Sequence, residues 1–492
     1  MNTLKNLYKT SLSLLTDFYQ LSMAYAYWKS GKADLESVFS LYFRKNPFNG
    51  GFTITAGLAN VIDYVKNFKF DSSDLNYLAN LQQSDGQPVF EQPFLDYLSK
   101  MEFSCDIDAV PEGSVVFPQE PLLRVRGPII QAQLLETPLL NLVNFQSLIA
   151  TKAARVCIST QGEPVLEFGL RRAHGIDGGL AVSRAAYIGG CAATSNVLAG
   201  KIYDIPVKGT HAHSWVMTFD TEKESFQAYA EAMPDNCVFL VDTYDTREGI
   251  RNAIQMGNEL RQSGREMIGI RLDSGDLAYL SIEARKMLDE AGFQNAKIFA
   301  SNDLDENIIQ SLKDQGAQIN VWGVGTKLAT AYDQPALGGV YKLSALKSAE
   351  GKWQYKLKLS EQAIKISNPG IHQVRRFCRQ GEYVGDAIYD IRLGLEEECT
   401  IVDPIDFTRR KTFTSNVQFQ DLLVPVFKNG QPVYTSPDIH KIRDFAQREL
   451  QSFHRGIKRF VNPHAYPVGL EKNLNELKTR LVLKARGFNS QA

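Results

Sequence analysis

Five short apolar runs in the middle of the chain each end in a group of polar residues, and this pattern constrains the fold more than any other feature. The runs, each with the polar group that follows it, are 165–168 before 169–172, 238–241 before 242–246, 267–270 before 271–276, 298–300 before 301–303, and 321–322 before 323–327. The last four recur roughly every 25–30 residues with helical patterns between them, which is typical of repeated βα units around a parallel sheet. Because parallel strands end at the same edge of a sheet, the pattern predicts an α/β fold whose polar groups meet at one edge.

One helix between these runs shows the helical pattern clearly. Asp245 is placed to cap its first turn, and Glu248 follows three residues later. Apolar positions then lie on one face, at Ile250, Ala253, Ile254, Gly257 and Leu260.

The rest of the chain divides into further parts by its patterns. A first helix is expected from Thr16 to Gly31. Its expected apolar face comprises Phe18, Leu21, Tyr25 and Trp28. The predicted parts are a sheet-bearing domain over 1–133, the βα region over 134–346, further strands over 347–430, and a helical C-terminal segment over 431–492.

Length and composition narrow the class of protein. The 492 residues suggest about three domains, and a net charge of −1 argues against a nucleic-acid or membrane-surface partner. The six cysteines show neither close pairing nor metal-ligand spacing, which favours a reducing compartment. No stretch resembles a signal peptide or approaches the roughly 18 apolar residues of a membrane span, so a cytoplasmic protein is expected.

Basic residues and histidines gather between 167 and 214. Arg171 and Arg172 follow a predicted buried strand, and 208–214 (KGTHAHS) places two imidazoles beside small residues. Small residues let backbone N–H groups approach an oxyanion, so phosphate handling and metal binding are both open. Arg171 and Arg271 would repel each other above a sheet unless an anion lies between them. The alternative to a functional role is that a single core histidine is a hydrogen-bonded structural residue.

Several motifs in a fixed order resemble the nicotinate phosphoribosyltransferase family of the type II phosphoribosyltransferase superfamily. They are TDFYQ at 16–20, FRKNPF at 43–48, the five strand-end groups, and NPHAYPV at 462–468, so the resemblance covers almost the whole chain. It implies an irregular βα barrel, a discontinuous α+β sheet domain in which the later strands pack onto the first ones, and a homodimer with sites at its interface. It also implies formation of nicotinate mononucleotide and pyrophosphate from nicotinate and phosphoribosyl pyrophosphate in NAD salvage, coupled to ATP hydrolysis through a phosphohistidine.

The resemblance selects His213 as the phosphorylated residue, while His211 stands at a position that relatives fill variably. A carboxylate on the second ring nitrogen of a nucleophilic imidazole would fix its tautomer, and Asp242 is the candidate. Arg271 is expected to act in catalysis. Asp273 is expected to serve the ribose hydroxyls and a magnesium-bound pyrophosphate, because Mg²⁺ binds through a carboxylate, waters and substrate phosphates.

The resemblance also implies a set of substrate-binding residues. Tyr19 and Phe168 would clamp the pyridine ring between aromatic faces, and Tyr19, Arg44 and Lys45 would come from the neighbouring subunit. Further contacts are expected from Arg171, Ser195 and Ser214, and contacts to the 5-phosphate from Ser301, Asn302, Gly323, Gly325 and Thr326.

Three alternatives stay open at this point. Nicotinamide phosphoribosyltransferase is the nearest, although its relatives place an acid where this chain has the neutral 194–196 (TSN), which better tolerates a substrate carboxylate. A catalytically inert ligand-binding relative is the second. An unrelated βα-barrel aldolase or isomerase, with Lys208 or Lys327 forming an imine, is the third.

Overall fold

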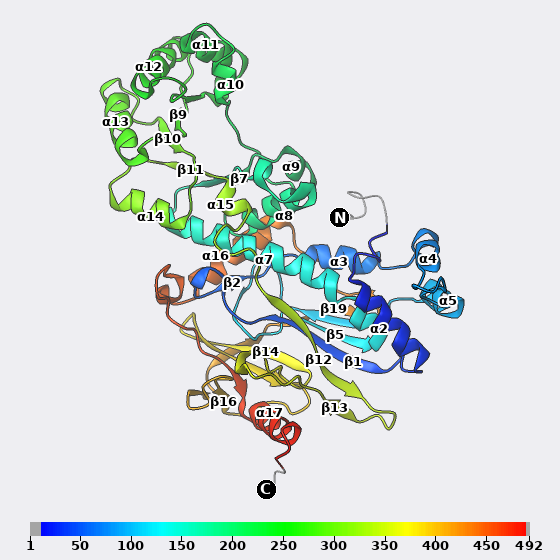
Figure 1. Ribbon diagram of the computed structural model, residues 1–492. Helices are drawn as coiled ribbons and strands as arrows, with labels where there is room; N and C mark the ends of the chain where they lie inside the picture. The colour runs from blue at the N-terminus through cyan, green and yellow to red at the C-terminus, as the bar shows by residue number, and fades with distance from the viewer. Residues whose placement is uncertain (1–10, 489–492) are drawn as a thin grey trace. The chain divides into compact units, whose positions relative to one another are not determined.

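The computed structural model describes residues 11–488, which divide into two compact units (Figure 1). The first unit contains the described residues up to 148 and those from 336 onward, and the second contains 149–335. The first unit is therefore discontinuous in sequence. The break in this unit runs from 148 to 336, whereas the sequence patterns placed its two limits at 133 and 347.

The larger sheet of the first unit joins both ends of the chain. Its strand order is β13-β12-β1-β5-β3-β19-β20. The strands are β1 (Glu36–Phe43), β3 (Asp106–Ala109), β5 (Leu123–Pro128), β12 (Gly339–Lys347), β13 (Trp353–Tyr355), β19 (Val424–Lys428) and β20 (Gln431–Pro432). β1 pairs antiparallel with both β5 and β12, and all its residues after Glu36 are buried. The sheet thus forms only when two distant parts of the chain meet.

A second, mixed sheet of the same unit has the order β17-β16-β21-β15-β14-β18. Its strands are β14 (His372–Arg379), β15 (Glu382–Asp390), β16 (Cys399–Val402), β17 (Arg410–Phe413), β18 (Gln418–Asp421) and β21 (Val468–Glu471). β21 lies inside the segment for which only helices were predicted. It pairs parallel with β15 and antiparallel with β16, between the helices α16 (Ile439–Gln451) and α17 (Lys472–Ala485).

The remaining elements of the first unit are mainly helices and short strands. They are α2 (Phe18–Lys29), η1 (Pro47–Asn49), β2 (Thr53–Ile54), α3 (Leu58–Lys66), α4 (Ser72–Ala79), α5 (Gln92–Lys100), β4 (Val115–Val116), α6 (Ile129–Leu134), η4 (Ala363–Lys365) and η5 (Arg455–Lys458). In α2 the buried residues are Gln20, Leu21 and Ala24, whereas Phe18 is 57% exposed. The predicted apolar face of this helix is therefore wrong at Phe18, because the helix turns a different stripe inward.

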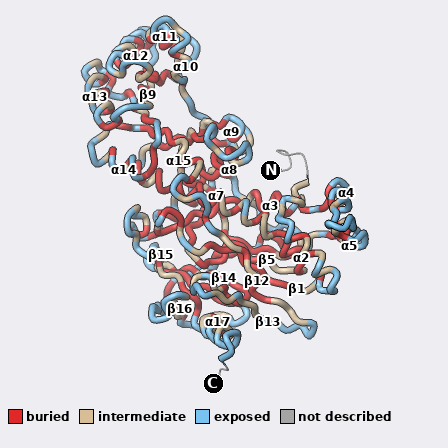
Figure 2. Tube along the Cα trace, in the orientation of Figure 1, coloured by how far each residue is buried: buried red, intermediate tan, exposed pale blue. Residues whose placement is uncertain are grey.

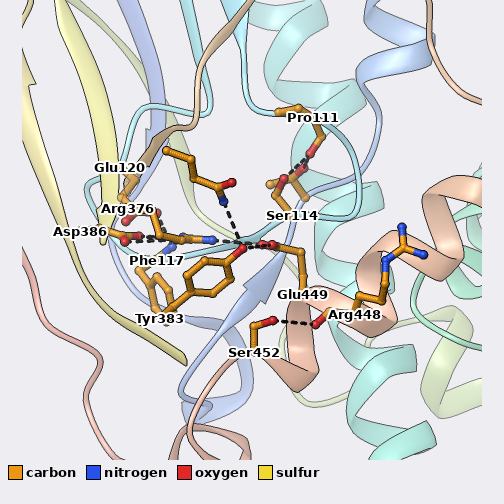
Figure 3. A network of polar contacts seen from close by, with 12 residues as sticks. Pro111, Ser114, Phe117, Glu120, Arg376, Tyr383, Asp386, Arg448, Glu449 and Ser452 are labelled. Carbon is orange, nitrogen blue, oxygen red and sulfur yellow. Dashed lines mark hydrogen bonds and ion pairs between the residues drawn. The ribbon is translucent and has the colours of Figure 1, made fainter. Parts of the chain in front are cut away.

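A buried ion network fastens the C-terminal strands of this unit to its N-terminal part (Figure 3). The Arg376 guanidinium donates to Asp386 at 2.6 Å and to Glu449 at 3.1 Å, and all three side chains are almost wholly buried. Tyr466 also donates to Asp386, at 2.9 Å. Burial, together with the nearby Asp386 carboxylate, raises the pKa of Glu120 well above its ordinary value. Glu120 belongs to the N-terminal part of the unit, so its contact with Asp386 connects that part to the C-terminal strands.

The second unit is built on a six-stranded sheet with the order β7-β6-β11-β10-β9-β8, in which every pair is parallel. Its strands are β6 (Val165–Glu167), β7 (Ala193–Thr194), β8 (Val238–Leu240), β9 (Gly269–Leu272), β10 (Lys297–Ala300) and β11 (Val321–Val324). The five predicted apolar runs are thus neighbours in one sheet, with β7 added at one edge. The α/β prediction is confirmed, while closure of this sheet into a barrel stays a prediction.

Helices connect these strands and cover the sheet. They are α7 (Glu136–Ser159), which begins in the first unit, η2 (Leu170–Arg172), α8 (Gly175–Ile188), α9 (Val197–Tyr203), α10 (His213–Val216), α11 (Glu222–Ala232), η3 (Pro234–Asn236), α12 (Thr246–Gln262), α13 (Leu277–Glu290), α14 (Glu306–Asp314) and α15 (Thr326–Ala329). The outer faces of α11, α12 and α13 are exposed, and the strands inside them are buried (Figure 2). Asp245 caps α12 as predicted, accepting a hydrogen bond from the Glu248 backbone N–H at 2.9 Å.

Candidate functional site

The carboxyl ends of the parallel strands surround a cavity of about 560 Å³ in the second unit. Its lining includes Phe168, Arg171, Ser195, Arg271, Asp273, Ser301, Asn302, Gly323, Gly325 and Thr326, all predicted from the sequence. It also includes Leu170, Arg172, Gly209, Thr210, His211, Ala212 and Asp303, which were not among the predicted site residues. Residues from five strand ends and from the 209–212 loop therefore meet in one space.

Arg271 supplies positive charge to this cavity from inside β9, not from the loop after it. Its guanidinium donates to the Thr210 hydroxyl, and its Nε is shielded from solvent without a hydrogen-bond partner among the described residues. Burial lowers the pKa of Arg271, the Asp273 and Asp242 carboxylates raise it, and the nearby Arg171 guanidinium lowers it. Within residues 11–488 neither arginine forms an ion pair with a carboxylate, so the cavity is suited to an anion.

His213 begins the short helix α10 and lies beside three polar side chains from neighbouring strand ends. Its Nδ1 is 3.1 Å from the Thr243 hydroxyl, and its Nε2 is 3.6 Å from Asp273 Oδ2 and 3.9 Å from Asp242 Oδ1. At 3.9 Å the Asp242 carboxylate does not hydrogen-bond the ring, so the predicted Asp242–His213 hydrogen bond is absent from this structure. The hydrogen-bond partner is Thr243, which the sequence reasoning missed.

Asp242 is held by the neighbouring strand end instead. Its Oδ2 accepts from the Asp273 backbone N–H at 2.7 Å and from the Ser274 hydroxyl at 2.8 Å. The other oxygen, Oδ1, is buried and has no hydrogen-bond partner in the described part of the chain. Asp273 in turn accepts a short hydrogen bond from the Ser301 hydroxyl. These contacts lock the ends of β8, β9 and β10 to one another.

His211 lies in the cavity lining but is only 7% exposed. Burial lowers its pKa to about 4, and the nearby Arg271 and His213 lower it as well. Its Nε2 accepts a hydrogen bond of 3.3 Å from the Leu240 backbone N–H. His211 is therefore a neutral residue that anchors the 208–213 loop to β8.

Glu167 organises the other side of the cavity, and sequence reasoning did not single it out. This fully buried carboxylate accepts from the Thr194 hydroxyl at 2.6 Å, from the Ser183 hydroxyl at 2.9 Å and from the Gly169 backbone N–H. It thereby joins β6, β7 and α8, and Phe168 and Ser195 directly follow Glu167 and Thr194 in the chain. An acid within an apolar strand was the available sequence signal.

Gly323 lines the cavity, as predicted for a phosphate-binding residue, and also has a packing role. It lies within β11, where a Cβ atom would stand 2.8 Å from the Phe168 ring. The missing side chain therefore makes room for the aromatic ring. Nearby Asn302 has a left-handed φ of 128°, a conformation that costs free energy and is common at functional sites.

The other predicted site residues lie elsewhere. Ser214 is exposed on α10 next to His213. Tyr19, Arg44 and Lys45 belong to the first unit, where Tyr19 is 47% exposed and burial raises its pKa. Arg44 has a shielded Nε with no hydrogen-bond partner among the described residues. Burial lowers the pKa of Lys342 in the same unit, and Arg44 and Lys358 lower it further, so these three cations lie near one another.

Residues 11–488 contain no group of three or more His, Cys, Asp or Glu side chains placed to hold a metal ion. They also contain no helix long and apolar enough to cross a membrane.

A parallel sheet with an arginine-lined cavity at the carboxyl ends of its strands defines an α/β protein with an anion-binding site. Three family models then match successive parts of the chain. They are the nicotinate phosphoribosyltransferase N-terminal domain over 14–144, the nicotinate phosphoribosyltransferase family over 165–370, and the C-terminal domain of that enzyme over 371–478. The chain belongs to the nicotinate phosphoribosyltransferase family of enzymes.

Individual relatives match over almost their full lengths. Nicotinate phosphoribosyltransferase of Bacillus subtilis is 46% identical over 96% of this chain and 97% of its own, and that of Caenorhabditis elegans is 38% identical over 96% and 93%. The crystal structure of human nicotinic acid phosphoribosyltransferase superposes with a TM-score of 0.82 at 31% identity, covering 95% of this chain and 99% of that one. The nicotinate-nucleotide pyrophosphorylase of Pyrococcus furiosus shares the fold, with a TM-score of 0.68 at 22% identity.

Proposed function

We propose that this protein joins nicotinate to phosphoribosyl pyrophosphate, forming nicotinate mononucleotide and pyrophosphate in NAD salvage. The observation that carries the proposal is the placement of Arg171 and Arg271 in one cavity with the aromatic Phe168. A planar pyridine carboxylate offers a ring for Phe168 and an anion for a guanidinium, and guanidinium binds carboxylate through two parallel hydrogen bonds. The family membership supports the same reaction.

The chain's own residues would act mainly by positioning and by neutralising charge. The pyridine nitrogen attacks the anomeric carbon while the bond from that carbon to the pyrophosphate oxygen breaks. This reaction needs no covalent help from the protein, since pyrophosphate leaves with its electron pair. Arg171 and Arg271 bind the negative groups, and Ser301 and Thr326 lie at strand ends suited to a phosphate.

We extend the proposal to ATP, which would phosphorylate His213 and so drive the synthesis. Support comes from the position of the imidazole beside Asp242 and Asp273, where a positive charge formed on the ring would be stabilised. Magnesium fits Asp273, whose carboxylate belongs to the cavity lining, because Mg²⁺ needs only one or two protein carboxylates. When bound, it would neutralise part of the pyrophosphate charge.

We also propose a homodimer whose sites are completed by Tyr19, Arg44 and Lys45 of the partner subunit. Around Tyr19 the apolar side chains of Leu15, Phe18 and Met23 are at least one third exposed, which is typical of a surface that another chain covers. The closed barrel and a cytoplasmic location belong to the same proposal. Val207 bridges to β7 while His211 binds β8, which supports closure, and all six cysteines are free thiols.

One assay tests the reaction. The purified protein is incubated with magnesium, phosphoribosyl pyrophosphate and either nicotinate or nicotinamide, with and without ATP, and the mononucleotide is identified by mass spectrometry. We expect nicotinate mononucleotide, formed faster with ATP. Nicotinamide mononucleotide as the main product, or no product, would overturn the proposed function.

A further inference from the structure

The imidazole of His213 has chemically different neighbours on its two nitrogens. The Nε2 side faces two carboxylate oxygens, Asp273 Oδ2 at 3.6 Å and Asp242 Oδ1 at 3.9 Å. On the Nδ1 side the Thr243 hydroxyl lies at 3.1 Å. Asp242 cannot turn away freely, because its side chain is 1% exposed and its Oδ2 is fixed by Asp273 and Ser274.

This asymmetry decides which nitrogen carries the proton of the neutral ring. At 3.6 and 3.9 Å these carboxylate oxygens lie beyond hydrogen-bond distance, but their negative charge favours a proton over a lone pair on Nε2. Nδ1 then carries the lone pair, and its neighbour must be a donor. A threonine hydroxyl can donate or accept, so in this tautomer the Thr243 hydroxyl, 3.1 Å away, is the donor to Nδ1.

We propose that Thr243 is a positioning residue for His213. Its hydroxyl holds the ring in the tautomer with the proton on Nε2 and keeps the Nδ1 lone pair pointed away from the carboxylates. Thr243 can do this because it directly follows Asp242 at the end of β8, so one strand end supplies a group to each side of the ring. Valine has nearly the same shape as threonine but lacks the hydroxyl, so it tests the hydrogen bond alone.

The consequence for reactivity depends on the proposed ATP-coupled function. The Nδ1 lone pair forms a bond to the γ-phosphorus of ATP, and the bond from that phosphorus to the β,γ-bridging oxygen breaks, with its electron pair leaving on ADP. Nε2 keeps its proton, and the carboxylates stabilise the positive ring. The freed Thr243 hydroxyl then donates to an oxygen of the transferred phosphoryl group.

The experiment compares wild type with Thr243→Val, Thr243→Ser and the control Thr218→Val. Thr218 is an exposed threonine just after α10 whose hydroxyl bonds the Trp215 carbonyl, at 2.6 Å. Two quantities are measured in each full-length protein: the ring tautomer of His213 by ¹⁵N NMR without ligand, and the rate of acid-labile phosphate formation on His213 with magnesium and ATP. Thermal unfolding shows that each variant is folded.

We expect Thr243→Val to lose the single tautomer and to slow phosphorylation about tenfold, in line with one lost hydrogen bond. Thr243→Ser and Thr218→Val should match wild type in both measurements. An unchanged tautomer in Thr243→Val, or equal losses in the Val and Ser variants, would overturn the proposal. If wild type forms no phosphohistidine, the ATP-coupled function fails, while the NMR comparison still decides the role of Thr243.

Discussion

Replacing Arg271 should separate activity from stability in this protein. The guanidinium lines the cavity, makes one hydrogen bond to Thr210 and leaves its shielded Nε without a partner among the described residues. A group that is poorly satisfied in the free protein but well placed for an anion contributes mainly when substrate is bound. Arg271→Met keeps much of the apolar stem and removes the charge, so it isolates that contribution.

Two magnitudes follow from this geometry. The bond to Thr210 contributes about 1.5–3 kcal/mol as a hydrogen bond from a charged donor, whereas the unpaired Nε costs about 1–3 kcal/mol. These contributions offset, so the free energy of unfolding should change by less than about 1.5 kcal/mol. Loss of a preorganised donor should raise the transition-state free energy by at least about 3 kcal/mol, which lowers kcat/KM about 150-fold.

Two quantities are measured for wild type, Arg271→Met and Arg271→Lys. They are kcat/KM with nicotinate as substrate and the free energy of unfolding in urea. Lysine should rescue activity poorly because an ammonium lacks the two-pronged guanidinium geometry. Arg251→Met is the matched control, because Arg251 is exposed on α12 and pairs only with Glu248 among the described residues. Near-wild-type kcat/KM in Arg271→Met, or a loss of stability above about 3 kcal/mol, would refute the reasoning.

Three further predictions follow from the structure. Tyr19→Ala and His213→Ala proteins each lack ATP-coupled activity, but a mixture of the two that exchanges subunits should recover about a quarter of wild-type activity, since half the dimers then hold one intact site. No recovery despite proven exchange would place both residues in one chain's site. Gly323→Ala should push a Cβ against the Phe168 ring, lower the free energy of unfolding by about 1–3 kcal/mol and raise KM for nicotinate. An unchanged KM in this variant would contradict the packing role. Burial lowers the pKa of His372 to about 4, so the folded protein holds this ring neutral while the unfolded chain protonates it near pH 6.5. The free energy of unfolding should therefore fall by up to about 3 kcal/mol as the pH drops from about 6.5 to 4. Urea unfolding at pH 7 and pH 5 should show a smaller fall for His372→Gln than for wild type.

Local patterns in the sequence predicted the elements that depend on nearby residues. The cap at Asp245 forms because its partner is the backbone N–H only three residues away. The apolar runs became neighbouring parallel strands, and their polar ends gathered around one cavity, because the carboxyl ends of parallel strands share an edge. The carboxyl ends of the strands were predicted less well, since Arg271 and Gly323, expected just after strands, lie inside β9 and β11.

Contacts between distant residues could not be read from those patterns. β21 formed a strand in a segment predicted as helical, because its partners β15 and β16 lie about 70 residues or more away in sequence. Phe18 is exposed because the packing of α2 buries Gln20 instead. In both places the surroundings outweighed the local preference.

The sequence by itself determined the α/β class, the strand-end residues and, through their order, the family. Only the tertiary structure decided how those residues face one another. Asp242 is bonded to the Asp273 backbone, so the hydrogen bond to His213 comes from Thr243. Glu167 became the centre of three hydrogen bonds because β6, β7 and α8 converge on it. Side-chain partners a few ångströms apart depend on how several loops pack together, and a linear pattern specifies which groups reach the edge of the sheet but not which of them touch.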